Sequence, residues 1–202
     1  MANARGPYAK STRVRAAAVE AAAELFGGAG YRGATFKDVA DKLGMTAAGL
    51  SYYFPDKDSL LRAVLEERDR PAVTAETALP PSPSHAELTD HVMAILSENI
   101  GHPGLAELHC VLSAEATSAD HPAHEHFRDR YRKARELLTD ALSAAAAHGE
   151  IRSSVPPRAL ATLLLSVLDG VQLQWLLDPE EVDLRETVRA FVSDLLAPSS
   201  PA

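Results

Sequence analysis

The chain has 202 residues, of which 46% are hydrophobic and 5% aromatic, and a formal net charge of −8. Its single cysteine, Cys110, excludes an internal disulfide, no signal peptide precedes the first predicted helix, and the longest apolar run, residues 159–168, is too short to cross a bilayer. Alanine and leucine dominate and no segment alternates long enough for a strand, so the sequence predicts an all-α, soluble and cytoplasmic protein.

Charge is divided unevenly along the chain. Residues 1–70 contain 11 basic and 9 acidic side chains, whereas residues 71–202 contain 9 basic and 19 acidic ones. Four basic residues precede the first acidic one: Arg5, Lys10, Arg13 and Arg15. A basic arm and head on an acidic body is typical of a protein whose N-terminal part contacts phosphate groups, and a solubilising tail is the alternative.

The first predicted helix covers residues 12–27, and residues 1–10 before it are expected to be disordered. Its inward side carries apolar residues at helical spacing: Val14, Ala18, Ala21 and Leu25. Gly27, Gly28 and Gly30 are expected to end this helix, since no Gly-Lys-Ser/Thr follows that would make them a phosphate-binding loop.

Residues 35–57 predict two short helices joined by a tight turn and followed by a third helix. Thr35 is a good N-cap, with Asp38 as its capping-box partner, and Thr46 caps the second helix. Gly44 stands where a left-handed residue ends the first helix, and Pro55 stops the second. One face of each helix is apolar: Phe36, Val39, Ala40, Leu43, Leu50, Phe54, Leu60, Leu61, Val64 and Leu65.

A helix, a short glycine-containing turn and a second short helix form the helix-turn-helix unit, which lays its second helix in the major groove of DNA. The outward side of the second helix here carries small, hydroxyl or aromatic side chains: Thr46, Ala47, Ala48, Gly49, Ser51, Tyr52 and Tyr53. Small residues let a helix approach another surface closely. The pattern favours a DNA-reading helix over its alternative, a helical hairpin in a bundle.

Residues 13–66 carry motif positions at fixed spacings: Leu25-Phe26, Gly30-Tyr31, Thr35, Asp38-Val39-Ala40, Gly44-Met45-Thr46, Gly49-Leu50, Phe54, Lys57 and Leu60-Leu61. In these positions the chain resembles the DNA-binding domain of the tetracycline-repressor (TetR) family of bacterial transcription regulators. That family usually has an aromatic residue after the leucine of its recognition helix, where this chain has Ser51. The contact made by that ring is therefore expected to come from Tyr52 or Tyr53.

The resemblance implies double-stranded operator DNA as the partner. The residues expected to face the major groove are Thr46, Ala47, Ala48, Gly49, Ser51 and Tyr52. Those expected to hold phosphates, together with the basic arm, are Thr35, Lys37, Tyr53 and Lys57.

Proline and glycine divide the rest of the chain into further helices. A helix from residue 56 is expected to reach residue 70, and residues 78–84 form a proline-rich linker. Further helices are expected from Ser84, from Leu105 and from Pro122, and the last two cover about residues 157–177 and 183–196. The whole chain is thus expected to hold about nine helices.

The helix expected over residues 157–177 is apolar on nearly every side, so it must be covered on every side. One domain can hide one face, and a partner chain can hide the other. We therefore expect a homodimer through helices 157–177 and 183–196, which the TetR resemblance also implies. The alternative is that both helices pack within one protomer.

No metal, cofactor or catalytic residue is expected. His121, His124 and His126 cluster without a supporting metal-ligand motif, and Cys110 has no visible orienting partner. Polar residues amid apolar stripes of the body instead suggest a pocket for an apolar small-molecule effector. The candidate lining residues are His91, Leu96, His109, Leu112, Glu115, Phe127, Tyr131, Leu168, Asp169 and Gln172.

Together these features predict a non-enzymatic, ligand-responsive repressor that binds a palindromic operator as a dimer. Residues 1–55 would form the arm and the helix-turn-helix domain, and residues 56–202 the helical domain for effector binding and dimerisation. The alternatives are a helical carrier or enzyme that has lost specific DNA binding, and a helical adaptor that binds only proteins.

Overall fold

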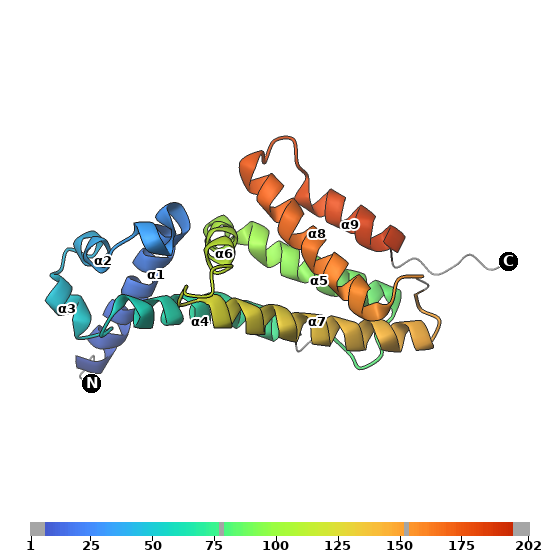
Figure 1. Cartoon of the computed structure of the whole chain (residues 1–202), viewed down its shortest axis with the longest axis horizontal. Helices are drawn as coiled ribbons and strands as arrows, with labels where there is room; N and C mark the ends of the chain where they lie inside the picture. The colour runs from blue at the N-terminus through green and yellow to red at the C-terminus, as the bar shows by residue number, and fades with distance from the viewer. Residues whose placement is uncertain (1–6, 77–78, 152–153, 196–202) are drawn as a thin grey trace, which may run out of the picture. The chain divides into compact units, whose positions relative to one another are not determined.

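The computed structural model describes residues 7–76, 79–151 and 154–195, and all regular structure in these ranges is helical. The nine helices that they form are α1 (Pro7–Gly33), α2 (Phe36–Lys42), α3 (Ala47–Ser51), α4 (Lys57–Glu76), α5 (His85–Gly101), α6 (Pro103–Glu115), α7 (His124–Ala147), α8 (Pro157–Leu177) and α9 (Leu184–Leu195) (Figure 1). The predicted all-α fold is confirmed, and α8 has the predicted bounds.

The chain forms two compact units, each described here by itself. Unit 1 consists of Met1–Arg70 and Glu107–His124, and unit 2 consists of Pro71–Ala106 and Glu125–Ala202. The predicted boundary between residues 55 and 56 falls inside unit 1, and as a division of the sequence it stays a prediction. Residues 107–124 belong with the helix-turn-helix segment, a grouping that sequence patterns did not suggest.

α1 is longer at both ends than the helix predicted over residues 12–27. Gly27 and Gly28 stay helical, and the helix breaks only at Gly30, which has φ 74° and ψ 166°. A glycine inside a helix costs about 1 kcal/mol relative to alanine, an amount that the alanine-rich flanks tolerate. A positive φ, in contrast, is the conformation that glycine adopts without steric cost. The chain therefore turns toward α2 at Gly30.

The core of unit 1 fixes the short helix α3 against its neighbours. Phe26 from α1, Val39 from α2, Leu50 from α3 and Leu61 from α4 are all buried. Burying one such side chain contributes about 1.5–3 kcal/mol. Because α3 spans only Ala47–Ser51, its position depends on this tertiary anchoring rather than on its own helical stability.

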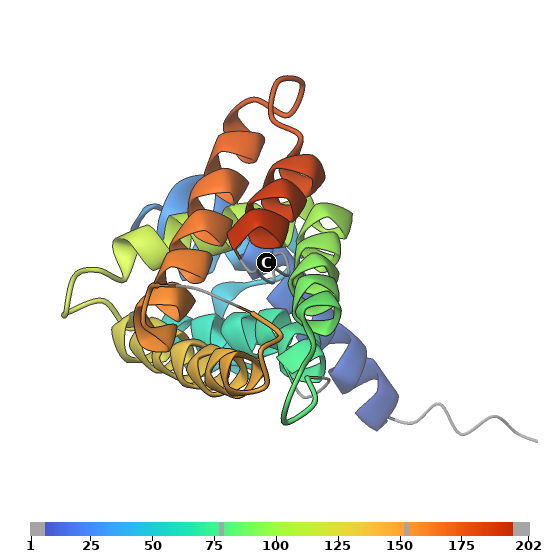
Figure 2. The same cartoon turned by 90° about the vertical axis from the view of Figure 1, so that its right-hand side faces the viewer.

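Unit 2 is built around α5, α7, α8 and α9. α8 and α9 lie side by side, and α5 also packs on α9 (Figure 2). Its buried apolar residues are Leu88, Val92, Met93, Leu96, Leu138, Ala141, Leu142, Ala145, Ile151, Leu160, Ala161, Leu164, Leu184, Val188 and Val192.

One side of α8 is apolar but uncovered in the single chain. Leu163, Leu173 and Leu177 are 46%, 48% and 77% exposed. Among the described residues, α8 is also the one helix whose length and composition would allow it to cross a membrane. Of its most apolar 18-residue stretch, 22% is buried. The apolar run of residues 159–168, predicted to be too short for this, is only part of α8. Exposed leucines that share one side of a helix indicate a candidate contact site.

Candidate nucleic-acid interface

A capping box starts α2, and a glycine forms part of the turn between α2 and α3. Thr35 Oγ1 accepts the Asp38 amide at 3.1 Å, and Asp38 Oδ2 accepts the Thr35 amide at 2.8 Å. These bonds hold the pKa of the Asp38 carboxyl below its usual value, so its negative charge faces the N-terminus of α2. Gly44 has φ 65° and lies directly after the C-cap residue. The predicted capping box and left-handed glycine are both confirmed.

α3 is capped at its start and held by apolar anchors at its end. Thr46 Oγ1 accepts the Gly49 amide at 3.1 Å. Leu50 and Phe54 are buried, and Leu50 O accepts the amides of Tyr53 and Phe54 at 2.9 and 3.0 Å. Only the Tyr53 amide makes the tighter i→i+3 bond. α3 ends at Ser51, three residues before Phe54, where the sequence had predicted its end.

The outward side of α3 presents mostly small groups to solvent. Thr46, Ala47, Ala48, Ser51 and Tyr52 are exposed, and Gly49 is half-buried. A Cβ atom added to Gly49 would lie 3.3 Å from Thr46 Oγ1, which is tighter than an ordinary contact. Hydroxyl groups at the tip of such a helix can donate to or accept from base edges in the major groove.

Two tyrosines directly follow α3. The Tyr52 ring is 83% exposed and packs edge-to-face on the half-buried Tyr53 ring, with centroids 5.2 Å apart. An exposed aromatic ring beside the helix can contact sugar, phosphate or base. This placement is compatible with the predicted replacement for the aromatic residue absent at Ser51, and that role stays a prediction.

Arg15 has a role that the sequence pattern missed. The sequence places it in a phosphate-binding arm, but it lies within α1, donates from Nη1 to Tyr53 O at 2.8 Å, and stacks over the Phe54 ring at 4.2 Å. The guanidinium therefore satisfies a carbonyl just beyond α3 and packs on the anchor of the same segment. No local pattern could have shown this, because the partners are 38 residues apart.

The predicted phosphate contacts Lys37 and Lys57 differ in their surroundings. Lys37 is exposed and forms an i,i+4 ion pair with Asp41, which raises the pKa of the Lys37 amine. Lys57 is half-buried, donates to Tyr31 O, and lies over the Tyr31 ring at 4.0 Å. Burial lowers the pKa of the Lys57 amine. Thr35, also predicted to hold phosphate, is exposed beside its cap.

Comparisons with known proteins agree with this geometry. Residues 18–64 match the family model described as bacterial regulatory proteins, tetR family, and residues 81–197 match the model of the BetI-type transcriptional repressor C-terminal domain. The second match alone covers more than half of the chain. The chain belongs to the TetR family of transcriptional regulators.

Individual relatives are distant in sequence but are matched over most of their length. The HTH-type transcriptional repressor AcnR of Corynebacterium diphtheriae is 27% identical over 91% of this chain and 92% of its own length. An HTH-type regulator encoded in the dhlA 5′ region of Xanthobacter autotrophicus is 25% identical, with 93% and 91% covered. A TetR-family regulator from Agrobacterium tumefaciens has the same fold, with a TM-score of 0.77 at 16% identity, 93% of this chain and 100% of that chain being covered.

As a TetR-family member, this chain is a DNA-binding transcriptional regulator. The alternative, a carrier or enzyme without specific DNA binding, is not favoured, because both family models match and the helix-turn-helix keeps its caps and apolar anchors. Proteins of this family are in general not enzymes.

The residues predicted to line an effector pocket fall in both units. Unit 2 holds His91, Leu96, Phe127, Tyr131, Leu168, Asp169 and Gln172, and unit 1 holds His109, Leu112 and Glu115. In unit 2, Tyr131 Oη donates to Asp169 Oδ2 at 2.7 Å, and Gln172 Nε2 donates to Ala106 O at 3.4 Å. Burial lowers the pKa of the His91 ring, which favours its neutral form. The pocket assignment stays a prediction.

The three clustered histidines each have a structural contact. His121 Nδ1 accepts the Ala123 amide at 3.2 Å, and His124 Nδ1 lies 2.8 Å from Ala116 O. The His126 ring packs edge-to-face on Phe127, with centroids 5.4 Å apart. The positions of these rings are thus accounted for by packing and hydrogen bonding within their own units.

Lys57→Ala is expected to weaken binding to all duplexes alike. Loss of one phosphate-neutralising charge should flatten the slope of log affinity against log salt by about one unit. Fluorescence anisotropy on a selected operator and a random duplex, each over a salt series, measures both effects. Lys133→Ala, which removes an exposed charge from α7 of unit 2, is the control. A change in base preference with an unaltered slope would contradict the assignment.

Proposed function

We propose that this chain is a cytoplasmic repressor that binds a palindromic operator as a homodimer and is released by a small apolar effector. The observation that carries the DNA-binding part is helix α3, which is capped at its start, exposes mostly small side chains, and is held by the buried Leu50 and Phe54. Each chain contributes one such helix, so a two-fold dimer presents two of them to successive major grooves. No catalytic role and no cofactor is proposed.

The uncovered side of α8 supports the dimer. At 100° per residue, Leu163, Gly170, Leu173 and Leu177 fall within about 80° of one another around the helix. A Cβ atom added to Gly170 would meet nothing within 4 Å, so this glycine leaves room for a partner helix to approach closely. We infer that the same surface of a second chain covers this side, with α9 alongside.

A second chain explains the apolar side of α8 better than a membrane does. Asp169 lies near the middle of the helix, where a charged side chain at the bilayer centre is costly. Leu160, Ala161 and Leu164 on the opposite side belong to the core of unit 2. A helix that buries one side in the hydrophobic core of its own chain and exposes an apolar other side is typical of a dimer interface.

The effector part rests on the composition of the body. Residues 71–202 are acidic and leucine-rich, and polar residues such as His91 and Gln172 are buried among apolar ones in unit 2. Pockets for small ligands combine an apolar lining with a few well-placed polar groups. We therefore propose that the effector is a largely apolar molecule with one or two hydrogen-bonding groups.

Selection of bound DNA from a pool of random duplexes tests the proposed function. We expect enrichment of an inverted repeat whose half-sites lie about 34 Å apart or slightly more, which is one turn of the duplex. The selected operator should bind one dimer, measured by light scattering of the complex. Equal recovery of all sequences would contradict specific operator binding.

A further inference from the structure

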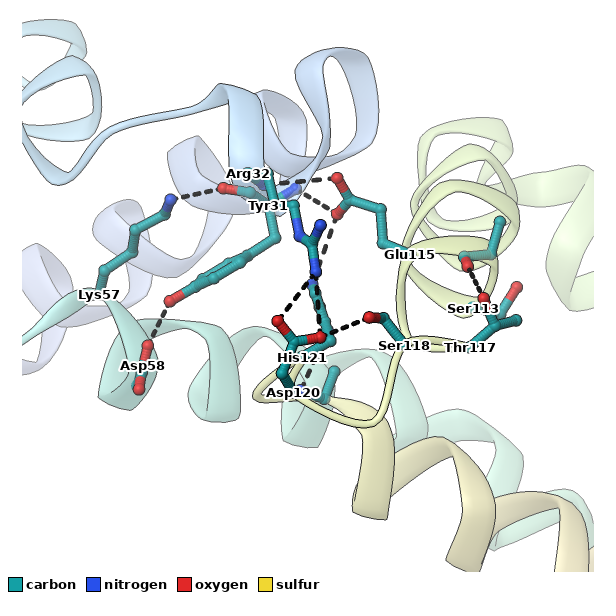
Figure 3. A network of polar contacts seen from close by, with 12 residues as sticks. Tyr31, Arg32, Lys57, Asp58, Ser113, Glu115, Thr117, Ser118, Asp120 and His121 are labelled. Atoms are coloured by element: carbon teal, nitrogen blue, oxygen red, sulfur yellow. Dashed lines mark hydrogen bonds and ion pairs between the residues drawn. The ribbon is translucent and has the colours of Figure 1, made fainter.

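A carboxylate from α6 reaches the break in α1. Glu115 is the last residue of α6, and Gly30 interrupts α1 just before Tyr31. Glu115 Oε2 accepts the Tyr31 amide at 2.7 Å, and Oε1 accepts the Arg32 amide at 3.4 Å (Figure 3). All of these residues belong to unit 1. A break in a helix leaves backbone amides without intrahelical partners, and here a side chain 84 residues away in sequence caps them.

Gly30 and Glu115 fit together in a way that no larger residue at position 30 would allow. A Cβ atom at Gly30 would lie 2.5 Å from Glu115 Oε1 and 3.0 Å from its Cδ. The φ of Gly30, 74°, is also one that other residues rarely adopt. Gly149 has a similar φ of 75°, but a Cβ atom there would meet nothing within 4 Å. The close approach of a carboxylate is therefore particular to Gly30.

Tyr31 connects the capped turn to α4. Its carbonyl accepts a hydrogen bond from Lys57 Nζ, and its hydroxyl donates to Asp58 Oδ1 (Figure 3). The ring packs edge-to-face on Phe26 and on His121, with centroids 5.6 and 5.1 Å apart. Tyr31 thus contacts α1, the start of α4 and the segment after α6, so its position depends on all three.

The segment after α6 adds two contacts around Glu115. Arg32 Nη2 donates to Asp120 Oδ1 at 3.3 Å. Because His121 Nδ1 accepts the Ala123 amide, the neutral His121 ring carries its proton on Nε2, which lies 3.5 Å from Glu115 Oε2. The Glu115 carboxylate therefore faces two backbone amides and one ring N–H, all of which favour its present position.

We propose that Glu115 is a positioning residue for operator binding: it fixes the turn at residues 30–34 and thereby the direction in which the helix-turn-helix begins. This inference rests on the proposed function. The turn is closed by the Ala34 amide, which donates to Gly30 O at 3.2 Å, and Thr35, the next residue, is the N-cap of α2. If the turn were free, α2 and α3 would have to be re-ordered whenever DNA is bound, which weakens apparent affinity.

Glu115→Ala is expected to lower affinity for the selected operator roughly 5- to 30-fold, the cost of ordering about one backbone residue. The salt slope should stay unchanged, because Glu115 contacts no phosphate. Glu115→Gln, which keeps the side-chain shape and one acceptor oxygen, should give an intermediate loss. In each variant, hydrogen exchange should report faster exchange of the Tyr31 amide, while circular dichroism checks that the protein is folded.

Glu107→Ala and Glu107→Gln are the matched controls, since Glu107 is an exposed glutamate on the same helix. They remove the same charge and should keep full operator affinity. If the wild-type protein selects no inverted repeat, the proposed function fails. If the wild-type protein selects one and Glu115→Ala binds it equally or more tightly, the inference about Glu115 is overturned.

A double-mutant cycle tests the direct contact. Gly30→Ala should destabilise the protein more than Gly149→Ala, because it adds a clash with Glu115 to the same backbone strain. The excess should shrink in the Glu115→Ala background, where the clash is absent. Additive changes in melting temperature for Gly30→Ala and Glu115→Ala would contradict the interlocked geometry.

Discussion

Leu173→Asp is expected to convert the dimer into a monomer and to lower operator affinity by roughly 10²- to 10⁴-fold, the gain that linking two binding modules provides. Leu173 is 48% exposed on the uncovered side of α8. In a dimer through this side, aspartate would be buried against apolar residues of the partner without a compensating charge, which is strongly unfavourable. In the single chain the same aspartate would remain in water, so the protomer should stay folded.

Analytical ultracentrifugation and operator titration measure the two effects together. Ser143→Asp adds the same charge at an exposed position of α7 and should leave both unchanged. Gly170→Leu is a second variant, because a Cβ atom at this position meets nothing within 4 Å in the single chain, whereas a leucine would obstruct a closely approaching partner helix. A Leu173→Asp protein that still sediments as a dimer would show that the interface lies elsewhere.

Features set by neighbours in sequence were predicted well. The capping box of Thr35 and Asp38, the left-handed Gly44 and the bounds of α8 all follow from residues within a few positions of one another. Such signals act through local hydrogen bonds and steric limits on φ, so a single sequence displays them directly. The apolar stripe that anchors α3 also follows from helical spacing.

Contacts between distant residues were not predictable in the same way. Glu115 was expected to line an effector pocket because it is a polar residue on an apolar stripe, and that role stays a prediction. Sequence patterns did not suggest that its carboxylate caps the α1 break at Tyr31 and Arg32. Arg15 was assigned to a basic arm by charge alone, yet it donates to Tyr53 O. A charged side chain looks the same in sequence whether its partner is solvent, DNA or a backbone group far along the chain.

The structure offers two routes for effector release. Two helices have residues in both units: α4, divided after Arg70, and α6, divided after Ala106. The start of α6 is bonded to α8 through Gln172 and Ala106 O, and its end holds the α1 break through Glu115. A shift of α6 would therefore act on the capped turn directly.

An apolar effector bound in the body is expected to lower operator affinity by roughly 5- to 150-fold, the usual range of allosteric coupling. It can do so only if it binds the operator-free conformation more tightly, since equal affinity for both conformations shifts nothing. A compound found by thermal-shift screening of apolar molecules serves as the probe. Its affinity is measured by calorimetry with and without the selected operator, and operator affinity with and without the compound.

Reciprocity requires that operator DNA weaken the compound by the same factor by which the compound weakens the operator. If α6 carries the coupling, this factor should fall in Glu115→Ala, because the α1 turn then no longer follows the end of α6, and it should persist in Glu107→Ala. An unchanged factor in Glu115→Ala would assign the coupling to α4 instead. A compound that binds equally well with and without operator would rule out this mechanism for that compound.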